Sequence, residues 1–143
     1  MQELAKHTRL TELVFRVSFS LIFIVGGLGH FARHAWMLER LEASPWLGWV
    51  VMIGSPSLLL WLSGAVMIVA GVTLLLGLHT RLSALALFLT LVPITLVMHI
   101  APDHMGPLLK NVAILGGLLH IFVRDAESFS LDRYLAGRET GMR

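Results

Sequence analysis

Residues 58–78, LLLWLSGAVMIVAGVTLLLGL, decide the fold, because this stretch of 21 residues contains no charged side chain. A helix that crosses a bilayer needs about 20 mostly apolar residues. Residues 13–31, 82–98 and 108–123 form three further apolar stretches close to that length. Backbone groups in lipid must hydrogen-bond to one another, so each stretch is predicted to be a helix. The sequence therefore predicts an all-α integral membrane protein built as a four-helix bundle.

The composition favours a membrane protein and excludes several other classes. Of the 143 residues, 56% are hydrophobic and 14% are charged, whereas about a quarter of a soluble domain is charged. The length favours a single domain over residues 1–143, with a polar tail at 124–143. A net charge of +2 does not indicate a nucleic-acid partner. Because the chain has no cysteine, it forms no disulfide, thiolate metal site or iron–sulfur cluster.

The distribution of lysine and arginine predicts the orientation in the membrane. With both termini inside, eight of these residues lie on the inner side and three on the outer side. The inner residues are Lys6, Arg9, Arg16, Arg81, Arg124, Arg133, Arg138 and Arg143, and the outer residues are Arg33, Arg40 and Lys110. Basic residues gather on the cytoplasmic side of membrane proteins. We therefore expect the N-terminus and the C-terminus to be cytoplasmic.

Residues 32–57, between the first two stretches, are predicted to lie at the outer interface of the membrane. Their apolar middle lies between Pro45 and Pro56 and is too short to cross a bilayer. The four tryptophans of the chain lie in this segment or just after it, at Trp36, Trp46, Trp49 and Trp61. Tryptophan prefers the level of the lipid headgroups. The segment is therefore expected to be interfacial or re-entrant, and to cap the bundle.

The spacing of polar and small residues predicts which helix faces pack together. At 100° per residue, Arg16 and His30 fall on one narrow stripe of the first helix, which should face protein, and His34 joins that stripe if the helix continues past Phe31. Gly64 and Gly71 lie one heptad apart in the second stretch and indicate a packing seam.

The fourth stretch carries a comparable pattern of small residues. Ala113-x-x-x-Gly117 has the spacing of a seam at which two helix backbones approach closely. We therefore expect this face of the fourth helix to pack against a neighbouring helix.

The candidate binding residues gather at the predicted outer end of the bundle. His30, His99 and Lys110 are expected to line a polar pocket beneath the tryptophan segment, with Thr95 one turn before His99. Histidine donates hydrogen bonds and changes its charge near neutral pH. The expected ligand is a quinone or a small anion.

Four further residues are weaker candidates for this site. His34, Asp103 and His104 are expected outside the hydrocarbon, where contact with water or headgroups explains them more simply. Arg16 is explained more simply as an anchor that fixes orientation. His30, His34, Asp103 and His104 have the chemistry of metal ligands, but two of the four lie in a loop, so no metal site is predicted.

Three segments carry a resemblance to a known family: GGLGHF at residues 26–31, PITLVMH at 93–99 and LLKNVAILGG at 108–117. On these motifs the chain resembles the DoxX family of small four-helix membrane proteins, over roughly Thr11 to Val123. The resemblance implies a multi-pass protein of the cytoplasmic (inner) membrane of a bacterium or archaeon. The family is best known for the membrane subunit of a thiosulfate:quinone oxidoreductase, which implies a redox-associated protein with quinone as its cofactor.

Three functions remain open from the sequence. The first is a membrane subunit of an oxidoreductase complex, with a quinone or small-anion pocket at the outer face. The second is a non-catalytic scaffold or assembly subunit, and the third is a small transporter that would have to be oligomeric. The expected partners are the lipid bilayer and either other membrane or redox subunits or further copies of the chain.

Overall fold

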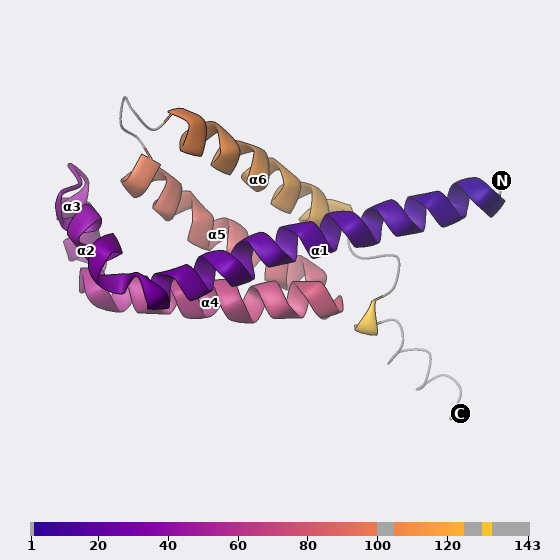
Figure 1. The fold of residues 1–143 in the computed structure, drawn as a ribbon, viewed down its shortest axis with the longest axis horizontal. Coiled ribbons are helices and arrows are strands. Elements are labelled where there is room, and N and C mark those ends of the chain that lie inside the picture. The colour runs from indigo at the N-terminus through magenta and orange to yellow at the C-terminus, as the bar shows by residue number, and fades with distance from the viewer. Residues whose placement is uncertain (1, 100–104, 125–129, 133–143) are drawn as a thin grey trace.

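The computed structural model describes residues 2–99, 105–124 and 130–132, without the side chains of residues 2–6 and 99. This part of the chain is all helical and contains six helices, shown in Figure 1. In chain order they are α1 (Gln2–Ala32), α2 (His34–Glu42), α3 (Leu47–Ile53), α4 (Pro56–Leu76), α5 (Thr80–His99) and α6 (Met105–Arg124). The all-α prediction is confirmed for these residues.

Four of the helices are long and apolar enough to cross a membrane. The candidate spans are His7–Ala32, Pro56–Leu76, Thr80–Met98 and Met105–Arg124. They contain the four predicted stretches except for Gly77 and Leu78, because the left-handed conformation of Gly77 ends α4 at Leu76. In each span at most a third of the most apolar window is buried inside the protein, so most of its surface is left for lipid. The chain is a multi-pass membrane protein.

Helix α4 packs against α1 and against α5, and α5 packs against α6 (Figure 1). Small residues bring α1 and α4 together at Gly27, Gly64 and Gly71. A Cβ atom added to Gly27 would lie 2.7 Å from the carbonyl oxygen of Gly64, and one added to Gly71 would lie 3.3 Å from that of Ser20. The predicted seam at Gly64 and Gly71 is therefore confirmed, and α1 is the helix that fills it.

The prediction that Ala113 and Gly117 form a packing face of α6 is correct for Gly117 and wrong for Ala113. The ring of Phe19 from α1 occupies the space that a Cβ atom of Gly117 would take, so Gly117 does lie at a close contact. Ala113 is exposed. The buried face of α6 instead carries Asn111, Ile114, Leu118 and Ile121, packed toward the core. These larger side chains fill the space between helices that an alanine would leave empty.

Residues 33–55 connect α1 to α4, and we call them the cap. They contain α2 and α3, and the chain between these two helices turns at Ser44 and Pro45. Leu41 of α2 and Val50 of α3 pack on Leu60 of α4, and Ser44 Oγ donates a hydrogen bond of 2.8 Å to the carbonyl of Val97 in α5. The cap therefore covers one end of α4 and α5, as the sequence predicted of this segment.

The opposite end of the bundle is closed by the turn between α4 and α5. Gly77 ends α4 with a φ of 68°, a left-handed conformation that glycine adopts without strain. Ser130, which follows α6, donates a hydrogen bond of 2.9 Å from its Oγ to the carbonyl of Gly77. The backbone N–H of His79 donates to Asp132 at 2.6 Å. The chain after α6 is thereby fastened to this turn.

Candidate functional site

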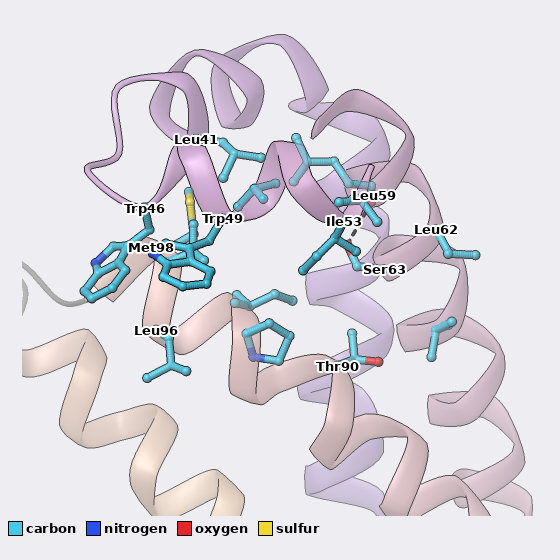
Figure 2. A pocket seen from close by; sticks show the side chains of 16 residues that line it. Leu41, Trp46, Trp49, Ile53, Leu59, Leu62, Ser63, Thr90, Leu96 and Met98 are labelled. Carbon is cyan, nitrogen blue, oxygen red and sulfur yellow. Dashed lines mark hydrogen bonds between the residues drawn. The ribbon is translucent and has the colours of Figure 1, made fainter. Parts of the chain in front are cut away.

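A cavity of about 580 Å³ lies between the cap and helices α4 and α5 (Figure 2). This volume is within the range of pockets that bind small molecules. Its lining of 16 residues is almost entirely apolar and includes the indole rings of Trp46 and Trp49. Ser63 of α4 and Thr90 of α5 are the hydroxyl-bearing residues in that lining. The site thus offers aromatic and aliphatic walls with a hydroxyl group on each of two helices.

Both hydroxyl groups are held by their own helices. Ser63 Oγ donates to the carbonyl of Leu60 at 2.9 Å, and Thr90 Oγ1 donates to the carbonyl of Ala86 at 2.8 Å. Serine and threonine commonly return their hydroxyl hydrogen to the preceding helical turn, because lipid and apolar side chains offer no other acceptor. These bonds satisfy the hydroxyl hydrogens without a ligand.

His30 of α1 lies directly behind Ser63. The imidazole is buried, with 7% of the residue exposed, and its Nδ1 is 2.9 Å from Ser63 Oγ and 3.2 Å from the carbonyl oxygen of Leu60. Gly64 makes this approach feasible, because a Cβ atom there would lie 2.8 Å from the Cβ of His30. The sequence placed His30 on an inward face, and the structure places it against α4. It does not line the cavity itself, but its hydrogen-bond partner does.

His34, a weaker candidate, takes part in a contact between the cap and α4. Its Nε2 is 3.2 Å from Ser57 Oγ, and its ring stacks on Trp61 with centroids 4.6 Å apart. The residue is half-buried and does not line the cavity. Its geometry holds the start of α2 against α4, whereas the sequence suggested contact with water or headgroups.

Thr95 is buried between α5 and α6 and also lies outside the cavity lining. Its hydroxyl donates to the carbonyl of Leu91 at 2.7 Å and accepts a hydrogen bond of 3.0 Å from Asn111 Nδ2. Lys110, which was expected to share a pocket with His30, is exposed. The inward polar residue at the start of α6 is its neighbour Asn111, because neighbouring helix positions point 100° apart.

The remaining candidates divide into those at the far end and those outside the described residues. Arg16 is buried beside the α4–α5 turn, where its Nη1 would lie 3.2 Å from a Cβ atom on Gly77, so it is remote from the cavity. Asp103 and His104 lie outside the described residues, as does the side chain of His99. Within the described part of the chain, no three histidine or acidic side chains gather in a way that would hold a metal ion.

Sequence reasoning did not identify Ser63, Thr90 or Asn111. Each is an uncharged polar residue inside an otherwise apolar span. A polar side chain at such a position needs a partner or a ligand, and that was the available signal. The sequence favoured the histidines because they ionise near neutral pH, but His30 and His34 do not line the cavity, whereas Ser63 does.

Comparison with known proteins agrees with this architecture. The model of the DoxX family matches residues 11–100, which include α2, α3, α4 and α5 and most of α1. His30, Ser63 and Thr90 all lie inside the matched region. A search of curated proteins gave no significant match, and a search of solved structures gave none either. Because the family match covers more than half of the 143 residues, this chain belongs to the DoxX family.

Proposed function

We propose that the protein is a quinone-binding membrane subunit of an oxidoreductase complex, and that the cavity beneath the cap is the quinone site. The observation that carries this proposal is the character of the cavity, about 580 Å³ of apolar space with two indole rings and two hydroxyl groups. An isoprenoid quinone is an apolar ring and tail with carbonyl oxygens as its main polar groups. Electrons would be exchanged with a redox-active partner subunit.

The lining of the cavity also supports one of the two ligands that the sequence left open over the other. None of its 16 residues is charged. Moving an anion from water into such a space costs several kcal/mol unless a cation or several donors compensate it. A neutral quinone avoids this cost. We therefore prefer quinone to a small anion as the ligand.

The proposed location is the cytoplasmic membrane of a bacterium or archaeon, with both termini in the cytoplasm. In support, among the described residues, Arg33, Arg40 and Lys110 belong to the cap end of the bundle, and Arg9, Arg16, Arg81 and Arg124 belong to the other end. In this orientation the cap and the cavity face the outer side of the membrane. Quinones diffuse within the bilayer, so a cavity between membrane-spanning helices is accessible to them.

A binding measurement with a matched pair of variants tests the quinone site. Val66 lines the cavity, whereas Val69, on the same helix, is 64% exposed on the lipid side. We expect the purified protein to bind a short-chain ubiquinone or menaquinone in calorimetric titration. Val66→Trp should fill the cavity and weaken binding at least tenfold, and Val69→Trp should leave it unchanged. Equal affinity of the two variants, or no binding by the unaltered protein, would contradict the proposal.

A further inference from the structure

Three polar atoms meet behind the wall of the cavity. His30 Nδ1, Ser63 Oγ and the carbonyl oxygen of Leu60 lie within 2.9 to 3.2 Å of one another. A carbonyl only accepts hydrogen bonds, so the contact with His30 is a bond only when Nδ1 carries the hydrogen. In the tautomer with the hydrogen on Nδ1, the group has two donors, the N–H of His30 and the O–H of Ser63, and both reach the carbonyl of Leu60.

This arrangement lowers the cost of moving the hydroxyl hydrogen of Ser63 from the carbonyl of Leu60 to a ligand. When a helical serine turns its hydroxyl away from the preceding turn, the carbonyl there keeps its backbone hydrogen bond but loses the side-chain bond, which is worth about 0.5–1.5 kcal/mol. Here His30 Nδ1 lies 3.2 Å from the carbonyl oxygen of Leu60, and in the tautomer with the hydrogen on Nδ1 it continues to donate to that oxygen. The hydroxyl hydrogen can then rotate toward the cavity, and that carbonyl still has a side-chain donor.

We propose that Ser63 donates its hydroxyl hydrogen to one carbonyl oxygen of a quinone in the cavity, and that His30 is the positioning residue that allows it to do so. The inference rests on the proposed function and names the chemical group that the site recognises. Figure 2 shows Ser63 on the α4 side of the cavity, with its hydrogen bond to Leu60 drawn as a dashed line.

Thr90, on the α5 wall, differs from Ser63 in one respect. Its hydroxyl donates to the carbonyl of Ala86 at 2.8 Å, and among the described residues no histidine or other side chain shares that carbonyl with it. Turning the Thr90 hydroxyl toward a ligand would therefore carry the full cost of breaking its bond. The two carbonyls of a bound quinone are consequently unequal, and only the one at Ser63 receives a strong hydrogen bond.

Infrared difference spectroscopy of a short-chain quinone, labelled with ¹³C at one carbonyl at a time, measures this inequality. In the unaltered protein, one carbonyl stretch should move to lower frequency and the other should stay near its position in apolar solvent. Ser63→Ala should abolish the shift and weaken binding about fivefold, the loss of one hydrogen bond of about 1 kcal/mol. Ser63→Thr, which retains the hydroxyl, should preserve both, and Thr90→Val should change neither.

Variants of His30 test its role as a positioning residue. His30→Phe should abolish the carbonyl shift although Ser63 is present, because the hydroxyl hydrogen then stays on the carbonyl of Leu60. His30→Asn places an amide N–H near the position of Nδ1 and should restore the shift. A purely structural role would not move the carbonyl frequency. Should His30→Phe fail to fold, Ser63→Ala still tests the hydrogen bond to the quinone, and loss of the shift in a folded His30→Asn would contradict the role of His30.

The outcomes separate this inference from the proposed function. If the unaltered protein binds quinone and Val66→Trp abolishes binding, but Ser63→Ala leaves the carbonyl frequencies and the affinity unchanged, the inference is wrong and the quinone site stands. If the unaltered protein binds no quinone, both are wrong. A carbonyl frequency shift that is lost in Ser63→Ala and kept in Ser63→Thr supports both the inference and the proposed function.

Discussion

Replacing Gly27 by alanine tests whether the contact between α1 and α4 both stabilises the fold and sets the geometry behind the cavity. The new Cβ atom would lie 2.7 Å from the carbonyl oxygen of Gly64 and 3.1 Å from the backbone nitrogen of Ile68. The first distance is 0.7 Å short of the 3.4 Å at which such contacts become ordinary. Both atoms belong to the backbone and cannot rotate away, so the two helices must separate.

The expected loss follows from two opposing effects. Overpacking a close contact costs about 1–3 kcal/mol, and alanine recovers up to about 1 kcal/mol relative to glycine through its helix propensity. We expect a net loss of about 1–2 kcal/mol in the free energy of unfolding. A separation of 0.7 Å would also lengthen the 2.9 Å contact between His30 and Ser63 to a distance that is no longer a hydrogen bond.

Unfolding of the purified protein by titration with SDS in a mild detergent, followed by circular dichroism, measures this loss. Gly116→Ala is the matched control, because a Cβ atom there would meet nothing within 4 Å, so this variant should be as stable as the unaltered protein or slightly more stable. Gly27→Ala should unfold at a lower SDS fraction and bind quinone more weakly. Equal unfolding midpoints for the two alanine variants would refute the reasoning.

Two further predictions concern the other end of the bundle and the orientation of the chain. Gly77→Ala should lower the free energy of unfolding by about 1–2 kcal/mol, because φ is 68° and the new Cβ atom would lie 2.9 Å from Ser130 Cα; an unchanged melting temperature would contradict this. Because the chain has no cysteine, single-cysteine variants report the orientation directly. A membrane-impermeant maleimide should label Ala43→Cys in intact cells and His7→Cys only after permeabilisation, and the reverse pattern would overturn the proposed orientation.

The fold was largely predictable from the sequence, because the length and apolarity of a spanning helix follow directly from the thickness of the bilayer. Residues 58–78 mark α4 without reference to any other part of the chain, and Gly64 and Gly71 mark its packing face. The two short helices of the cap were not predicted as helices. At nine and seven residues, α2 and α3 are too short for a clear periodic pattern.

The candidate site was predictable only in part. The position of a residue around its own helix predicts that it faces inward, as it does for His30 and Thr95. It does not predict which neighbouring helix the residue meets, and His30 faces α4 whereas Thr95 faces α6. His30 and Thr95 lie at different helix interfaces, and the sequence therefore assigned them to the same predicted pocket incorrectly. Ser63 was missed because its importance comes from the cap that covers it, which is a property of the tertiary structure.

The most direct test of the proposed quinone site is photolabelling with an azidoquinone, followed by mass spectrometry to locate the attached residues. The label should fall on the peptides that carry Trp49, Val66 and Pro93, which line the cavity, and an excess of unmodified quinone should prevent it. Labelling that resists competition and spreads over the lipid-facing surface, or that concentrates on the exposed face of α6, would contradict the existence of a quinone site beneath the cap.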